Sequence, residues 1–167
     1  MPSGPLRFCR GIIRCMRTIT VRSSEREEMV EITREVERFL IEALENHPVA
    51  EAATPHLRKE GSLLLFTQHT TCGLTINENA DPDVKRDMLA WLRWLVPQYP
   101  DSPGKGAAAP GFRHFEHNSD AHIKSSLVGS SVTVPFENGK LLLGRWQGIY
   151  LCEFDGPRER KVIVTVL

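Results

Sequence analysis

The chain lacks an apolar run long enough to cross a membrane, and its 21 basic and 21 acidic residues leave a formal net charge of zero. The first absence excludes a membrane-spanning helix. The second removes the global field that draws proteins to nucleic acids or anionic membranes. A basic stripe and a stacking motif are missing too, so we expect neither nucleic acid nor membrane as a partner.

Cysteine is scarce, with four residues and no CxxC pair. This usage favours reduced thiols in a cytoplasmic protein over a disulfide scaffold. The four are Cys9, Cys15, Cys72 and Cys152. The first 17 residues hold four arginines and no acid, a weak sign of organelle targeting. We favour an N-terminal extension over residues 1–16, poorly ordered or an edge strand, before one domain at 17–167.

Hydrophobic content of 41% in 167 residues suffices for a single core, and no internal repeat divides the chain. The clearest helical pattern covers residues 24–46, where Met29, Ile32 and Val36 begin an apolar face. Ser24 and Glu27 have the spacing of a capping box. A second helix is predicted from Asp81, as N-cap, to Pro97. Proline, glycine and alanine predict a loop over 98–111.

Most other segments have β character. Strands are predicted at 17–21, 61–68, 130–136, 140–144, 145–154 and 160–167. The Asn138-Gly139 pair indicates a tight hairpin between two of them. Sequential strands interrupted by two main helices predict an α+β single domain, a sandwich of mainly antiparallel strands.

Polar residues crowd the segment that follows the apolar strand 61–68, where scaffolds often display functional groups. They are His69, Thr70, Thr71, Asn77, Glu78, Asn79 and Asp81. Turn and capping roles are the simpler interpretation for several of them, Asp81 above all. His69 and Glu78 flank what we interpret as one apolar turn, which favours function for both.

A second polar cluster lies at residues 114–126. If His114 ends a loop and His122 lies in a short helix, both can converge with His69. Three imidazoles and a water suit zinc, whereas magnesium prefers oxygen ligands. The spacing matches no standard signature, so a loop that binds nothing is an equal alternative.

Phosphate binding is suggested by Lys124, Ser125 and Ser126, which we place at a helix start. A solvated lysine beside capping serines is the alternative. Gln147 needs a partner if it is buried in its apolar strand. Arg158 follows a tight turn and either clamps an anion or lies free on the surface.

Three separated stretches together resemble the secondary thiamine-phosphate synthase family, a YjbQ-like family. They are FTQHTTCGLTINENADPDVKRDM, HNSDAHIKSSLVGSSVTVP and GKLLLGRWQGIYLCEFDGPRERKV. The resemblance spans about residues 17–167. It implies a YjbQ-like α+β sandwich, a homotrimer with pockets near subunit boundaries, and the joining of a pyrimidine pyrophosphate to a thiazole phosphate with release of pyrophosphate.

The resemblance also assigns roles. Catalytic roles fall on Glu78, Asn79, Asp81 and Gln147. Substrate or phosphate binding falls on Thr70, Thr71, Lys124, Ser125, Ser126 and Arg158. Metal binding falls on His69, His114 and His122, with zinc favoured and magnesium possible.

The chain departs from the family pattern at Phe112, where tyrosine is common, at His117, where glycine is common, and in its longer loop 98–111. Because three histidines suit zinc better than the magnesium of pyrophosphate chemistry, we keep two further functions open. One is a metal-dependent hydrolase of an ester or phosphoester. The other is a non-catalytic trimer that binds a metabolite or partner protein.

Overall fold

A computed structural model describes residues 15–45, 60–98 and 111–167. Its elements, in chain order, are β1 Met16–Arg22, β2 Glu28–Glu31, α1 Thr33–Glu45, β3 Glu60–Thr67, β4 Cys72–Glu78, α2 Pro82–Leu95, α3 Ser119–Val128, β5 Ser131–Glu137, β6 Lys140–Leu141, β7 Gln147–Glu153 and β8 Glu159–Val166. The arginines of the proposed targeting stretch up to residue 14, Cys9 and most of the loop 98–111 lie outside the described residues.

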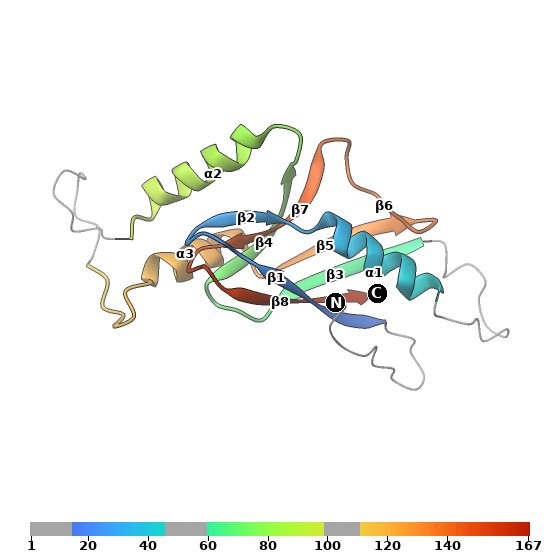
Figure 1. Ribbon diagram of the computed structural model, residues 1–167, viewed down its shortest axis with the longest axis horizontal. Helices are drawn as coiled ribbons and strands as arrows, with labels where there is room; N and C mark the ends of the chain where they lie inside the picture. The colour runs from blue at the N-terminus through green and yellow to red at the C-terminus, as the bar shows by residue number, and fades with distance from the viewer. Residues whose placement is uncertain (1–14, 46–59, 99–110) are drawn as a thin grey trace.

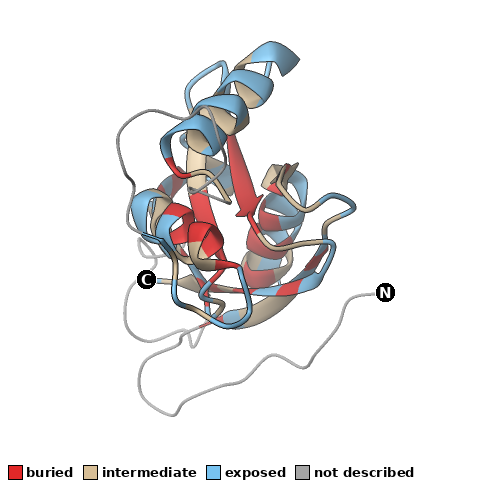
Figure 2. Ribbon diagram, turned by 90° about the vertical axis from the view of Figure 1, so that its left-hand side faces the viewer, coloured by how far each residue is buried: buried red, intermediate tan, exposed pale blue. Residues whose placement is uncertain are grey.

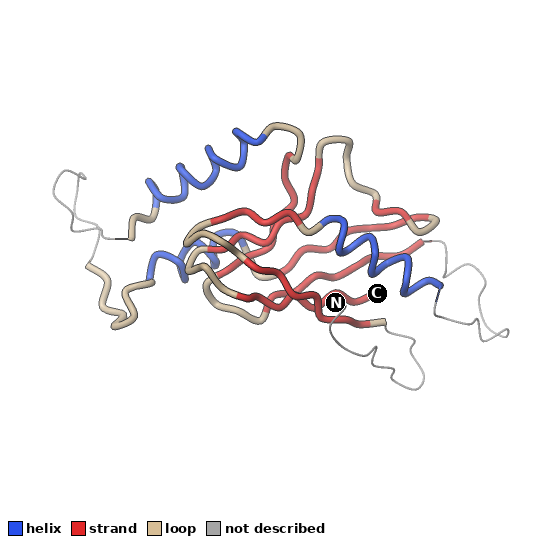
Figure 3. Tube along the Cα trace, in the orientation of Figure 1, coloured by secondary structure: helices blue, strands red, loops and turns tan. Residues whose placement is uncertain are grey.

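The strands form two sheets, in the orders β1-β8-β3-β5-β6 and β2-β7-β4. Every strand pair among the described residues is antiparallel. Figure 1 shows α1 beside the long sheet, with α2 and α3 gathered toward the opposite end, and Figure 3 shows how loops rather than helices connect most strands. The predicted α+β fold is confirmed, with α3 as a third helix.

Strand β7 has both faces buried, because it lies between two apolar layers. Ile149 and Leu151 face the main core with α1 and the five-stranded sheet. Tyr150 and Cys152, which alternate with them, pack in a second cluster with residues of α2 and α3. The buried strands lie at the centre of Figure 2. The small sheet is therefore the middle layer of the domain.

The first predicted helix begins nine residues too early. Residues 28–31 form strand β2 and pair with β7, and α1 starts only at Thr33. Ser24 and Glu27 form no capping box; the backbone N–H of Ser24 donates to the Glu28 carboxylate instead. Met29 is buried, as predicted, but from a strand. Its spacing to Ile32 and Val36 fits a helix, and only the pairing of this segment with β7 makes it a strand.

The segment interpreted as an apolar turn is a strand, β4, which pairs with β7 from Cys72↔Glu153 to Glu78↔Gln147. The hairpin prediction is confirmed, since Asn138 and Gly139 have positive φ and connect β5 to β6. Strand β6 ends at Leu141, shorter than predicted.

Helix α2 follows the predicted pattern at its start, where the Asp81 carboxylate accepts a hydrogen bond from Asp83 N–H at 2.8 Å. None of its residues is buried. No helix within the described ranges is both long and apolar enough to span a membrane. The described cysteines, Cys15, Cys72 and Cys152, are buried, and Cys72 and Cys152 are free thiols.

Candidate functional site

A buried ion pair joins the two sheets at one end of the domain. Glu153 ends β7 in the small sheet, Arg160 lies in β8 of the large sheet, and their exposed fractions are 0% and 5%. The guanidinium contacts both carboxylate oxygens, at 2.5 and 2.7 Å. Arg160 also donates to the Thr71 hydroxyl at 2.9 Å, which gives that predicted site residue a structural partner.

Three connections between the sheets meet at this pair. The Glu153 carboxylate accepts hydrogen bonds from the Ser23 hydroxyl, in the loop from β1 to β2, and from the N–H groups of Phe154 and Asp155, between β7 and β8. Thr71 belongs to the connection from β3 to β4. We call Ser23, Thr71, Glu153, Asp155, Arg158 and Arg160 the β7–β8 corner.

Hydrogen bonds decide the charge of Glu153. Burial alone raises the pKa of this carboxyl. The hydrogen bond from Arg160, the Asp155 N–H, the Arg160 charge and the Ser23 hydroxyl outweigh burial and hold the pKa below its usual 4.5. Burial has no such opposition at Cys152, where it raises the thiol pKa to about 12. The corner therefore keeps a full negative charge in the interior beside an inert thiol.

Arg158 is held by its own turn. Its guanidinium donates to the Asp155 carbonyl at 2.6 Å and to the Asp155 carboxylate at 2.7 Å. The Asn118 side chain donates to the same carboxylate at 3.1 Å, while its own Oδ1 is buried without a hydrogen-bond partner among the described residues. Arg158 thus stabilises the turn before β8, and its role as an anion clamp stays a prediction.

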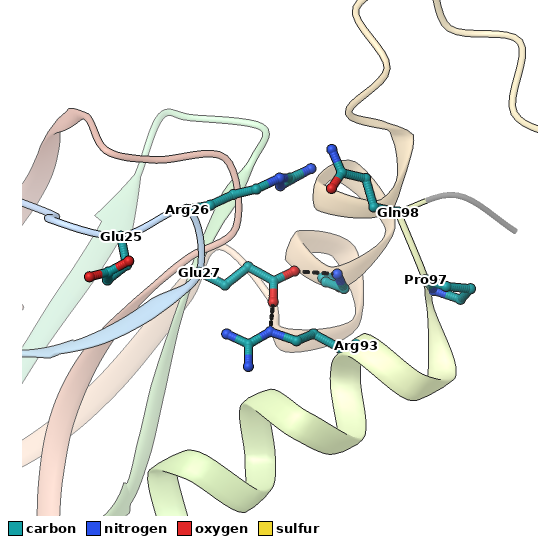
Figure 4. Close-up of a pocket in the computed structure, with 7 residues that line it drawn as sticks. Glu25, Arg26, Glu27, Arg93, Pro97 and Gln98 are labelled. Carbon is teal, nitrogen blue, oxygen red and sulfur yellow. Dashed lines mark hydrogen bonds and ion pairs between the residues drawn. The ribbon is translucent and has the colours of Figure 1, made fainter. Parts of the chain in front are cut away.

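A cleft of about 510 Å³ opens next to the corner. It is lined by Glu25, Arg26, Glu27, Arg93, Pro97, Gln98 and Lys124, which we call the Lys124 cleft. Arg26 connects the two regions, because it donates to the Phe154 carbonyl at 2.8 Å. Figure 4 shows the labelled residues coming from the loop before β2 and from the end of α2.

Lys124 is not a solvated lysine, because only 1% of it is exposed. Its ammonium group contacts Asp120 at 2.9 Å and Glu27 at 2.5 Å. Nor does it lie at a helix start, since α3 begins five residues earlier at Ser119. The prediction that Lys124 lies at a helix start is therefore wrong, while phosphate binding by this residue stays a prediction. Its position in the cleft keeps an anion-binding role open.

The two serines that follow have structural contacts. Ser125 donates to the Cys72 carbonyl at 2.7 Å, fastening α3 to β4, and it is buried. Ser126 donates back to the His122 carbonyl of its own helix at 2.9 Å. Both hydroxyls are thus donors to backbone groups. Their predicted role as phosphate ligands gains no support from these contacts.

The three predicted metal ligands divide into one histidine and a pair. His69 Nε2 accepts a hydrogen bond from the Lys161 N–H at 2.9 Å, and burial and the Arg160 charge lower the pKa of its imidazole. The His114 and His122 rings lie edge to face, 5.4 Å between centroids, and His114 Nε2 is 3.6 Å from Glu116. The described residues of a single chain bring no three His, Cys, Asp or Glu side chains together for a metal ion.

The predicted catalytic residues lie at the other end of β4. A strand of seven residues separates its ends by about 20 Å, so Glu78 lies far from Thr71 and Cys72. Near Glu78, Asn79 Oδ1 accepts a hydrogen bond from the Tyr150 hydroxyl at 2.5 Å. Gln147 is exposed, and its Oε1 accepts from the Gly144 N–H at 2.7 Å. The expectation that His69 and Glu78 flank one turn is wrong, because β4 intervenes.

We call Glu78, Asn79, Asp81 and Gln147 the Glu78 end. Asp81 is exposed and caps α2, so its local role is structural. Thr70 is exposed in the connection from β3 to β4, at the opposite end of the strand. One chain therefore presents two separated polar regions, because β4 parts Thr70 and Thr71 from Glu78, Asn79 and Asp81.

Several charged residues of the site were missed by the sequence interpretation. Glu153 follows residues that are buried on both faces of β7, and Arg160 lies seven residues later, across a turn. A charge at the end of a fully apolar strand requires a buried partner, and the facing strand of a hairpin-like turn supplies it. Glu27 and Arg93 carried no such signal, because both lie on amphipathic segments where charges are expected.

The fold is that of a small two-sheet α+β domain. Its β7–β8 corner and Lys124 cleft place charged groups at one end of the central buried strand β7. The family model described as UPF0047 protein YjbQ-like matches residues 17–167. The chain belongs to the YjbQ-like family.

Relatives of similar length occur in bacteria and archaea. The UPF0047 protein YugU of Bacillus subtilis is 44% identical over 91% of this chain and 98% of its own. A UPF0047 protein of Methanocaldococcus jannaschii is 41% identical over 93% and 96%. The crystal structure of an uncharacterised YjbQ/UPF0047 protein from Clostridium acetobutylicum matches with a TM-score of 0.73 and 41% identity, over 90% of this chain and 98% of that one.

Replacing Glu153 by glutamine will destabilise the domain, because Arg160 is then buried opposite a neutral group. Breaking a buried pair from one side costs about 3–5 kcal/mol. Urea unfolding at neutral pH measures this. The matched control is Glu159→Gln, which removes a half-exposed partner of Arg22 and is expected to cost less than about 1 kcal/mol. Equal losses in the two variants would contradict the role given to the pair.

The same carboxyl predicts an acid limb of stability. In the unfolded chain Glu153 takes up its proton near pH 4.5, but in the folded chain only at lower pH. Its contribution is thus complete above pH 4.5 and is lost as the pH falls through the folded-state pKa. His69, whose pKa is lowered from 6.5, contributes an earlier loss. The loss below pH 4.5 should be smaller in Glu153→Gln, while the loss that begins near 6.5 should persist.

Proposed function

We propose that the protein is an enzyme that acts on a phosphorylated small molecule bound in the Lys124 cleft. The observation that carries this proposal is the cleft itself, with three cationic side chains, Arg26, Arg93 and Lys124, along a volume of about 510 Å³. Arginine and lysine are the side chains that bind phosphate oxygens most strongly. The adjoining β7–β8 corner holds Arg26 in place through the Phe154 carbonyl.

The reaction we propose is the synthesis of thiamine phosphate. A pyrimidine pyrophosphate and a thiazole phosphate would be joined, and pyrophosphate would leave. This reaction develops negative charge on the leaving group, which cations fixed in a partly buried site stabilise. Support comes from the sequence resemblance and from the cationic cleft. A metal-dependent hydrolase would use the same cleft for a phosphoester, and a binding protein would use it without turnover.

A divalent metal remains part of the proposal, with zinc favoured and magnesium possible. Within one chain the residues do not fit a three-histidine zinc site, because the described part of the chain brings no three metal-binding side chains together and His69 Nε2 already accepts a backbone hydrogen bond. The pair of His114 and His122, with Glu116 beside it, is the part of the set that stays together. A metal at this pair needs further ligands.

The homotrimer is also a proposal, and helix α2 supports it. Trp91, Trp94 and Leu95 are 62%, 64% and 52% exposed. The helix lies at the outside of the domain in Figure 1 and is largely pale blue at the top of Figure 2. Contiguous exposed apolar groups of this size mark an interface. A neighbouring copy would also allow the Glu78 end of one chain to approach the cleft of another.

The synthase proposal predicts release of pyrophosphate when the full chain is mixed with both precursors and a divalent metal. With either precursor alone there should be none, and a chelator should abolish the release. A coupled pyrophosphate assay measures it, with the exposed substitution Arg22→Gln as a control that keeps full activity. Phosphate release from a single precursor would instead establish the hydrolase, and saturable binding without turnover would establish the binding protein.

The trimer proposal predicts that the double substitution Trp91→Glu with Trp94→Glu lowers the mass in solution from three chains to one. Charged groups cannot be buried without partners in an apolar contact. Light scattering after size-exclusion chromatography measures the mass. The control is Arg86→Glu on the same helix, where the arginine is 75% exposed and, within the described ranges, pairs only with Asp83. A wild-type monomer, or a Trp variant that stays trimeric, would contradict the proposal.

A further inference from the structure

Five charged side chains alternate in sign through the Lys124 cleft. Arg26 contacts Asp120 at 3.0 Å, Asp120 contacts Lys124 at 2.9 Å, and Lys124 contacts Glu27 at 2.5 Å. The series ends where Arg93 Nε pairs with the other oxygen of Glu27. In Figure 4 the Glu27 carboxylate extends from the loop before β2 into the cleft, toward Arg93. One carboxylate therefore occupies the point where cations from α2 and α3 meet.

Lys124 does not depend on Glu27 to balance its charge. The ammonium group is 1% exposed and needs a counter-charge, which Asp120, one helical turn earlier and 0% exposed, already provides. Asp120 is fully buried and does not line the cleft, whereas Glu27 is 8% exposed and belongs to the loop of residues 23–27 that lines it. If the Glu27 side chain turned outward, Lys124 would keep a buried partner. Glu27 is thus the replaceable anion of the series.

Arg93 presents further donors at the same point. It is 53% exposed and pairs with Glu27 through Nε. Among the described residues neither terminal nitrogen of its guanidinium has a hydrogen-bond partner. Along α2 it lies about 160° around the helix from Trp91 and Leu95 and about 100° from Trp94, so it points away from the apolar face proposed for the trimer. A guanidinium whose two terminal nitrogens are available as donors suits an anion with several oxygens.

We infer that the Glu27 carboxylate holds the place of a substrate phosphate and is exchanged for it when the substrate binds. This inference rests on the proposed function, and it identifies the ligand class as a phosphate monoester or pyrophosphate. With Glu27 in place, three cations face two carboxylates and the series has one positive charge. With Glu27 turned outward it has two, which matches a phosphate dianion. A metal cation would meet three like charges there, so the point does not suit a metal.

The test is a calorimetric titration of the full chain with inorganic phosphate and with pyrophosphate at low salt. We expect pyrophosphate to bind. Glu27→Gln should bind it about tenfold more tightly, because a charged contact no longer has to be broken. Arg93→Gln should bind it about tenfold more weakly. The matched control is Arg86→Gln, two turns earlier on the same side of α2 and 75% exposed, which should match the wild type. Thermal melts verify that every variant is folded.

Unchanged or weaker binding of pyrophosphate by Glu27→Gln would overturn the exchange. Glu27 would then be a structural residue that links α2 to α3. Absence of binding in both the wild type and Glu27→Gln would overturn the exchange too. The pyrophosphate assay distinguishes this failure from that of the proposed function. If Glu27→Gln binds pyrophosphate about tenfold more tightly but the precursors are not turned over, the synthase proposal fails and the exchange proposal stands. If Arg93→Gln and the wild type turn over the precursors equally and neither binds the anion in the titration, the exchange proposal fails and the synthase proposal stands.

Discussion

The ion pair between Glu153 and Arg160 is the interaction on which the rest of the domain depends. It links the middle sheet to the large sheet at the end where three connections cross from one to the other. A buried pair costs desolvation, and it is maintained here because Ser23, Thr71 and two backbone N–H groups satisfy its remaining oxygens and donors. The corner thereby fixes the loop that carries Arg26 and Glu27, and with it one wall of the cleft.

This arrangement explains why one chain shows two polar regions. Strand β4 runs from the corner to the Glu78 end, about 20 Å away, and its pairing with β7 fixes that separation. A rigid middle layer cannot bend to bring Glu78 to Lys124. Chemistry that needs both regions must therefore combine different copies, which links the oligomer proposed from α2 to the site. The contact proposed for the apolar face of α2 would therefore also bring the Glu78 end of one copy to the charged cleft of another.

Much of the fold could be predicted from local patterns. The strands of the last third and the Asn138-Gly139 turn follow from β-branched residues and from the preference for positive φ. Strand β2 could not, because Met29 continues the helical spacing of α1 and only its pairing with β7 reveals a strand. The sequence indicated which polar residues belong to the site, but it could not indicate which of them contact one another. Lys124 was found, yet its partner Glu27 is 97 residues away in sequence, and no local pattern reports such a distance.

The most direct test of the central claim is a crystal structure of the full chain with inorganic pyrophosphate. We predict that the anion lies beside Lys124 and Arg93, that the Glu27 side chain is turned out to solvent, and that the pair of Glu153 and Arg160 is unchanged. Pyrophosphate bound elsewhere, or an anion in the cleft with Glu27 still between the two cations, would contradict it.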